Sequence, residues 1–204
     1  MSTDREAILS RVRGALAPLE KRVPLPDWND ELIHMRTLRG DVDAWTLFRE
    51  RLGLVKGLPL EGAPALVAWL EQNGWTHGYC DPGLWPRLQS AFPTGFTVET
   101  VFDRARVDDY QFGITRAAGA VAETGTLILT DGATSNRLAA LAPWVHIAVL
   151  QRDRIHLDLQ HAVTELADDP NIVFCTGPSK TADVEGILIE GVHGPGQQVA
   201  LLLE

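Results

Sequence analysis

The apolar positions in the first part of the chain recur roughly every three or four residues, which is the spacing of an amphipathic helix. Three segments show this pattern: residues 3–16, 43–52 and 63–73. In the last of them, Leu66, Val67 and Leu70 form one apolar stripe, and Gly74 follows as a residue type that commonly ends a helix. The sequence therefore predicts three helices in this part of the chain.

The rest of the chain mixes short β-prone runs with further helical segments. The predicted strands are residues 75–80, 97–102, 126–130, 146–151, 171–175 and 198–203. Helical patterns lie between them, in a short piece through Trp85 and Leu88 and at residues 157–166 and 182–190. Strands that alternate with helices are typical of a mainly parallel sheet. The predicted fold class is α/β, with an open, mainly parallel sheet flanked by helices.

Proline residues separate the first helix from the rest of the chain. Pro18, Pro24 and Pro26 interrupt the helical pattern. The sequence therefore predicts an N-terminal helix and proline-containing arm, residues 1–40, followed by one α/β domain, residues 41–204. A length of 204 residues suits a single domain with such an arm.

Composition and charge narrow the function classes. Hydrophobic residues make up 45% and charged residues 22% of the chain, which is ordinary for a folded globular protein. The net charge of -9 argues against a nucleic-acid partner, because phosphate binding needs a basic face. The N-terminus is polar, and no apolar run reaches the roughly 18 residues of a transmembrane helix. We therefore expect a cytoplasmic protein with no membrane insertion.

The cysteine pattern does not suggest a cofactor. Cys80 and Cys175 lie far apart in the sequence and form no Cys-x-x-Cys pair. Iron–sulfur clusters and structural zinc sites need more cysteine or histidine ligands at closer spacing. The expectation is therefore no cofactor and no metal site.

Residues 113–130 contain the first candidate site. Glu123 lies at the entry of the β-prone run, beside the hydroxyls of Thr124 and Thr126 and the flexible Gly125. A carboxylate among apolar neighbours needs a charge partner or hydrogen bonds. Glu123 is either a structural acid that caps backbone N–H groups or a site acid that faces a ligand.

Two glycine-containing segments near the C-terminus are further candidates. Residues 176–181, Thr-Gly-Pro-Ser-Lys-Thr, join a predicted strand to a predicted helix, where backbone N–H groups bind anions well. They lack P-loop spacing, so the segment is either an anion site or a capped turn. In residues 191–196, His193 is either an acid, a base, a ligand or a hydrogen-bonding strut. The glycine order there, after a predicted helix, is not that of a dinucleotide-binding fingerprint.

A basic residue lies between the Glu123 strand and the next predicted strand. Arg137 precedes Pro143 and His146 in this connection. An arginine is a common fork for carboxylates and phosphates. Arg137 is therefore either a salt-bridge partner of Glu123 or a substrate clamp.

These segments together resemble a known family. The motifs are Gly-Ile-Thr-x-Ala and Ala-Glu-Thr-Gly-Thr within residues 113–126, Arg137 with Pro143 and His146, and two motifs within residues 176–195. The last two read Thr-Gly-Pro-Ser-Lys-Thr-Ala-Asp-Val-Glu and Gly-Val-His-Gly-Pro. In this order they resemble the LutC/YkgG family (lactate utilisation protein C), which is built on the LUD domain. The resemblance covers about residues 40–204.

The resemblance implies a fold like that of the NagB/RpiA/CoA-transferase superfamily. It also implies a role in oxidising L-lactate to pyruvate with partner proteins, at least one of which carries iron–sulfur clusters. Since this chain shows no electron carrier of its own, it is expected to be a non-redox accessory subunit, or to bind a small carboxylate or phosphate-bearing ligand for a partner.

The alternative is a stand-alone enzyme or binding protein of the CoA-transferase or sugar-phosphate isomerase-like class. CoA transferases use the Glu of a Glu-Asn-Gly motif as nucleophile, and Glu123-Thr124-Gly125 is partly similar, with Thr in place of Asn. The sequence does not decide whether the isolated chain is catalytic. The candidate catalytic residue is Glu123. The candidate ligand-binding residues are Thr115, Thr124, Gly125, Thr126, Arg137, Gly177, Ser179, Thr181 and His193.

Overall fold

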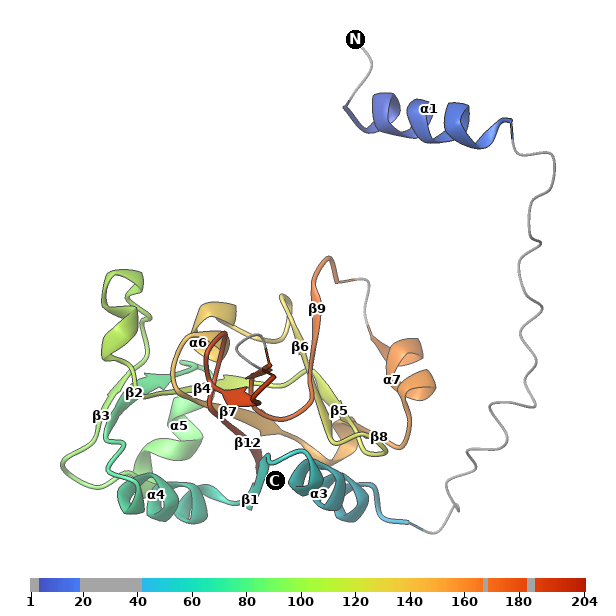
Figure 1. Cartoon of the computed structure of the whole chain (residues 1–204). Coiled ribbons are helices and arrows are strands. Elements are labelled where there is room, and N and C mark those ends of the chain that lie inside the picture. The colour runs from blue at the N-terminus through green and yellow to red at the C-terminus, as the bar shows by residue number, and fades with distance from the viewer. Residues whose placement is uncertain (1–3, 19–41, 167–168, 183–185) are drawn as a thin grey trace. The chain divides into compact units, whose positions relative to one another are not determined.

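A computed structural model of the chain describes residues 4–18, 42–166, 169–182 and 186–204. The chain divides into two units, Met1–Leu38 and Arg39–Glu204. In the first unit, helix α1 (Asp4–Leu16; Figure 1) agrees with the predicted helix. Its side chains Ile8, Val12 and Leu16 are exposed. Most of the predicted proline-containing arm lies outside the described residues.

A six-stranded parallel sheet forms the centre of the second unit (Figure 1). In spatial order its strands are β1 (Leu58–Glu61), β12 (Gln197–Leu202), β7 (Val145–Leu150), β4 (Phe112–Arg116), β2 (His77–Cys80) and β3 (Thr97–Glu99). Every residue of β7 is buried, as expected for a central strand that is covered on both faces. The predicted α/β class with a mainly parallel sheet is confirmed.

Helices cover both faces of this sheet. They are α3 (Ala44–Leu54), α4 (Ala63–Gln72), α5 (Trp85–Leu88) and α6 (Arg137–Leu141). Leu70 of α4 and Leu88 of α5 pack with Ile114 and Ile147 in the main apolar core. Gly113 points to the opposite face, because side chains alternate along a strand. There the α6 backbone at Ala139 approaches Gly113 so closely that an added Cβ would clash.

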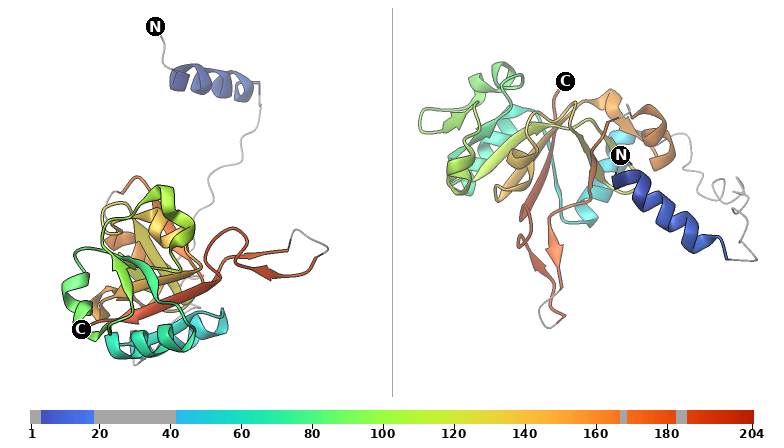
Figure 2. Two further views of the ribbon diagram at one scale, coloured as in Figure 1. Left: turned by 90° about the vertical axis from the view of Figure 1, so that its left-hand side faces the viewer. Right: turned by 90° about the horizontal axis from the view of Figure 1, so that it is seen from above.

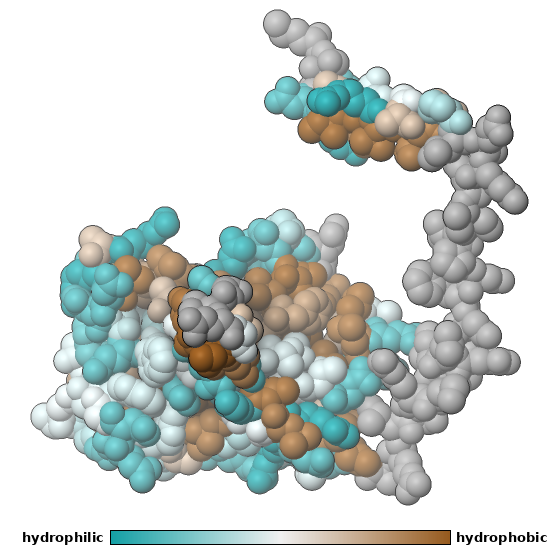
Figure 3. All heavy atoms as spheres, in the orientation of Figure 1, coloured by the Kyte–Doolittle hydropathy of each residue, from teal (hydrophilic) through white to brown (hydrophobic). Residues whose placement is uncertain are grey.

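A smaller four-stranded sheet packs beside the first. Its spatial order is β8 (Ile155–His156), β5 (Gly119–Val121), β6 (Thr126–Thr130) and β9 (Ile172–Cys175). Strands β5 and β6 form an antiparallel hairpin, and α7 (Leu159–Glu165) packs its buried Ala162 on Val121 and Ile128. Apolar side chains gather in the region of β6 and β9 in Figure 3, and Ile172 and Phe174 of β9 are exposed.

The helix predicted over residues 182–190 is wrong at the described positions. Strands β10 (Lys180–Thr181) and β11 (Ile189–Glu190) form an antiparallel hairpin, which extends away from the large sheet in Figure 2. Gly186 has a φ of +73°, which a helix does not accommodate. Residues 183–185 lie outside the described part of the chain.

Candidate functional site

The Glu123 carboxylate lies at the start of helix α7. Glu123 is half-buried on the turn between β5 and β6, and its Oε1 accepts a hydrogen bond of 3.3 Å from the backbone N–H of Leu159. Its own N–H donates to the Leu157 carbonyl at 3.0 Å. A negative charge is favourable at a helix N-terminus. The observed contacts are therefore those of the structural, helix-capping alternative.

Two of the candidate glycines pack against the end of helix α3. Gly125 has a φ of +65°, and an added Cβ would clash with the backbone nitrogen of Leu52. Gly177 has a φ of +76°, and an added Cβ would clash with the carbonyl oxygen of Val55. Both turns therefore need glycine for backbone conformation and for close packing.

A chain of threonine hydroxyls joins these two turns. Thr124 Oγ1 lies 2.7 Å from Thr126 Oγ1, which lies 2.8 Å from Thr176 Oγ1. Lys180 Nζ donates to the Val55 carbonyl at 2.9 Å. The structure thus brings Thr124, Gly125, Thr126 and Gly177 together at the C-terminal end of α3.

Ser179 and His193 belong to a second group. The Ser179 N–H donates to the Pro195 carbonyl, and its carbonyl accepts from the Gly191 N–H, both at 2.9 Å. His193 is exposed on the same loop. Thr181 continues from Ser179 into β10, where it pairs with Ile189 of β11.

The glycine-rich loop of residues 191–196 closes around Trp144. An added Cβ at Gly191 or at Gly196 would clash with the indole ring of Trp144. The loop therefore needs glycines to seat this ring.

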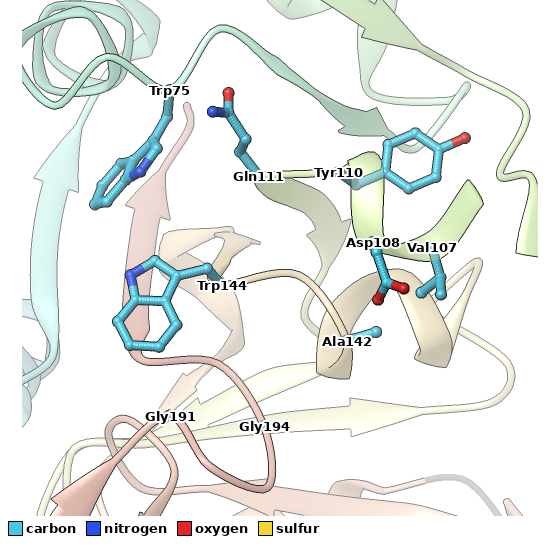
Figure 4. A pocket seen from close by; sticks show the side chains of 9 residues that line it. All are labelled: Trp75, Val107, Asp108, Tyr110, Gln111, Ala142, Trp144, Gly191 and Gly194. Carbon is cyan, nitrogen blue, oxygen red and sulfur yellow. The ribbon is translucent and has the colours of Figure 1, made fainter.

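A cavity of about 320 Å³ opens beside this loop (Figure 4). The cavity lies at the amino ends of β2, β4 and β7. It is lined there by the residues just before these strands, Trp75, Gln111 and Trp144. The Gln111 side-chain oxygen accepts from the Thr76 and His77 N–H groups at 2.8 and 3.0 Å. The side-chain oxygen of Gln111 is therefore already occupied by two hydrogen bonds to the backbone.

Arg137 forms an ion pair with an acid other than Glu123. Its Nε lies 2.8 Å from Asp131 Oδ1, and both side chains are partly exposed. Arg137 is the first residue of α6, and Asn136 caps that helix through the Ala139 N–H. The contact recorded for Arg137 is thus local, within the connection between β6 and α6.

Thr115 is fully buried in the large sheet. Its Oγ1 lies 2.9 Å from His146 Nε2, and His146 Nδ1 lies about 3 Å from the side-chain amide of Gln198. Burial lowers the pKa of His146 to about 4, so the ring is neutral at pH 7. His146 and Gln198 are polar residues in mainly apolar strands, and this pattern is a sequence signal from which the network could have been found.

A groove of about 370 Å³ lies at the opposite, carboxyl ends of the strands. Arg116 ends β4, and Gln151 and Arg154 follow β7, the latter in the 3-10 helix η3 (Arg152–Arg154). Thr130 at the end of β6 and Asp169 before β9 also line it. Sequence reasoning missed this groove, because residues 112–116 were not recognised as a strand of the parallel sheet.

The fold and these sites define an α/β protein with an open parallel sheet and a groove at the carboxyl ends of its strands. The family model of the LUD domain matches residues 89–203. This chain therefore belongs to the LUD domain family. Within the described ranges, no helix has the length and apolar character needed to span a bilayer.

Similar curated proteins carry one recurring name. "Lactate utilization protein C" of Deinococcus radiodurans is 34% identical over 102 residues, which is 48% of each chain. The protein of that name from Bacillus licheniformis is 31% identical over 107 residues, covering 48% of this chain and 45% of the relative. The chain thus spans about half the length of these relatives.

A solved structure has a similar fold. It is a DUF162 family protein from Deinococcus radiodurans, with a TM-score of 0.59 and 21% identity, and the match covers 79% of this chain and 96% of that one. At this identity the likeness concerns the fold alone.

Proposed function

We propose that this protein acts in lactate utilisation, as a component of a system that oxidises L-lactate to pyruvate. The observation that carries the proposal is its similarity, at 34% and 31% identity, to proteins named lactate utilization protein C. The LUD domain match over residues 89–203 supports it, since it covers most of the second unit.

Within that system the chain acts as a non-redox subunit alongside iron–sulfur partner proteins. Oxidation of lactate to pyruvate releases two electrons, which need an acceptor. Iron–sulfur clusters are held by four protein ligands, usually cysteine thiolates, and the chain has two cysteines. Burial raises the pKa of the Cys80 thiol to about 12 and that of Cys175 to about 11, which disfavours the ligating thiolates. A partner is therefore the natural place for the redox centre.

The second candidate function is that of a CoA-transferase-like or sugar-phosphate isomerase-like enzyme with Glu123 as the reacting acid. The half-buried position of Glu123 on a turn beside two hydroxyls favours it. The contact with the Leu159 N–H opposes it, because this oxygen already accepts a hydrogen bond.

Reconstitution separates these functions. Lactate-dependent dye reduction is measured with this chain alone, with purified iron–sulfur partners alone, and with all components together. We expect turnover only in the complete mixture. Turnover by the lone chain would refute the accessory role, and full activity of the partners without it would refute participation in the reaction.

A variant of Glu123 tests the second candidate. Glu123→Gln removes the charge but keeps the shape, and Glu71→Gln changes an exposed acid on α4 as the matched control. The accessory role predicts that both variants support the complete reaction. Loss of CoA-transfer activity in Glu123→Gln alone would instead establish the enzymatic role of this residue.

A further inference from the structure

The groove lies next to a reversal point in the chain topology. Strands β2 and β4 are neighbours in the sheet, yet the chain continues from β2 to β3 at one edge and from β4 to β7 in the other direction. Connections that diverge in this way leave a crevice at the carboxyl ends of the two strands, and open α/β sheets bind ligands there. Arg116 ends β4 at this crevice and also lines the groove.

Two arginines line the groove from the side of the large sheet. Arg116 and Arg154 are both exposed, and neither guanidinium has a hydrogen bond or an ion pair with any other described residue. The absence of a side chain at Gly83 leaves room for the Arg116 guanidinium: an added Cβ there would lie 3.1 Å from both Arg116 Nη2 and Asp81 Oδ1. The buried Asp81 carboxylate itself accepts a hydrogen bond of 2.7 Å from the Gly83 N–H, which fixes the turn that follows β2.

Two acids line the groove from the side of the small sheet. The Asp169 carboxylate is occupied, because it accepts from the N–H groups of Asp131, Gly132 and Asn171 at 3.2, 2.8 and 3.0 Å. Glu165, at the end of α7, is exposed and has no hydrogen bond or ion pair with the other described residues. It remains as an acceptor for a ligand's hydrogen-bond donor.

The charges of the lining indicate the class of ligand. Two cationic and two anionic side chains balance each other, so a multiply charged phosphate would meet repulsion from Glu165 and Asp169. A singly charged carboxylate can bind both arginines with less repulsion from the two acids, and a hydroxyl on its neighbouring carbon can donate a hydrogen bond to the Glu165 carboxylate. The volume of about 370 Å³ is near the lower end for ligand sites, which suits a small molecule.

We propose that this groove binds a short carboxylic acid that carries a hydroxyl on the neighbouring carbon. Arg116 and Arg154 hold the carboxylate, and the Glu165 carboxylate accepts a hydrogen bond from the hydroxyl. This inference rests on the proposed function for its biological setting and names the substrate class that the non-redox subunit presents to its partners.

The test is a calorimetric titration of the full chain with L-lactate, acetate and inorganic phosphate at pH 7. We expect L-lactate to bind more tightly than acetate, which lacks the hydroxyl, and more tightly than phosphate. Arg116→Gln and Arg154→Gln should each weaken lactate binding by roughly ten- to a hundredfold, as expected for losing a charge-assisted hydrogen bond. Glu165→Gln should reduce the preference for lactate over acetate.

Arg152→Gln is the matched control. Arg152 lies in the same 3-10 helix as Arg154 but approaches Asp43 and Glu204 at 3.6 Å, and it does not line the groove. This variant should bind lactate as the unaltered protein does. If an arginine-to-glutamine variant loses its circular dichroism spectrum, the Lys substitutions at 116 and 154 take its place; they keep the charge but lose the planar fork, and weaker binding is still expected.

Several outcomes overturn the proposal: lactate affinity unchanged in both arginine variants, equal losses in the Arg152 control, or tighter binding of phosphate than of lactate. The proposed function is judged separately by reconstitution. A chain that is required for turnover but binds no lactate refutes the groove assignment alone. A chain that binds lactate through Arg116 and Arg154 but is dispensable for turnover refutes the proposed function alone.

Discussion

Thr115 Oγ1 and His146 Nε2 lie 2.9 Å apart in the interior of the large sheet, on the neighbouring strands β4 and β7. The other ring nitrogen of His146 meets the amide of Gln198 on β12 at about 3 Å. Thr115 and His146 are fully buried, and a neutral imidazole offers one hydrogen-bond donor and one acceptor. The hydroxyl and the amide can satisfy both ring nitrogens, so the network is stable as long as the ring remains neutral.

The first prediction concerns acid stability. Burial lowers the pKa of His146 from 6.5 to about 4, so the unfolded chain binds the proton first as the pH falls. The free energy of unfolding should therefore decrease as the pH drops from about 6.5 to about 4, by an amount on the order of 3 kcal/mol for this group. Urea denaturation between pH 7 and pH 4 measures it.

His146→Gln provides the comparison for this prediction. It keeps a buried hydrogen-bonding side chain without a titrating ring, so it should be less stable at pH 7 but lose less stability on acidification. Equal pH slopes for the two proteins would show that His146 does not govern acid unfolding, because all other titrating groups are shared.

The second prediction separates stability from activity at Glu123. A single hydrogen bond of 3.3 Å to the Leu159 N–H, near solvent, stabilises only weakly. Glu123→Gln should lower the free energy of unfolding by less than about 1 kcal/mol, since the Gln oxygen still accepts this hydrogen bond. A loss of several kcal/mol in thermal or urea melts would contradict the observed contact, and activity data for the variant would then report on folding.

The third prediction concerns Trp144, whose indole ring packs against the glycine-rich loop of residues 191–196. Trp144→Ala should loosen the loop of residues 191–196 and speed hydrogen exchange of the Gly191 N–H, which donates to the Ser179 carbonyl. Phe174→Ala is the matched control, because Phe174 on β9 is 45% exposed and Trp144 is 46% exposed. Faster exchange at Gly191 in both variants would indicate general destabilisation rather than loss of the packing contact between Trp144 and the loop.

The longest strands that the sequence predicted, such as residues 126–130 and 146–151, consist mainly of apolar residues, a pattern that is visible without any tertiary information. Strand β4 was missed because Gly113 and Arg116 break its apolar pattern, although each has a tertiary reason: α6 packs on Gly113, and Arg116 emerges at the groove. The β10–β11 hairpin was missed because residues 182–190 also fit a helical period.

Glycine itself is ambiguous in a single sequence. Gly125 and Gly177 are candidate ligand-binding residues in the sequence, but the atoms that approach their backbones closely in the structure belong to the C-terminal end of α3. Nothing in the local sequence distinguishes a ligand from another part of the chain, because both make the same steric demand. The ligand roles of the candidate residues stay predictions.

The last prediction measures that steric demand. Gly125→Ala should destabilise the fold in two ways: a φ of +65° costs about 1–2 kcal/mol for a residue with a side chain, and the new Cβ would clash with the Leu52 backbone nitrogen. Because backbone shifts to relieve such a clash cost roughly 1–3 kcal/mol more, we expect a total loss of about 3 kcal/mol in urea denaturation. Gly74→Ala is the matched control, since Gly74 has a φ of +71° and open space around its Cα. It should show the backbone cost alone, so equal losses in the two variants would mean that the turn does not pack tightly on α3.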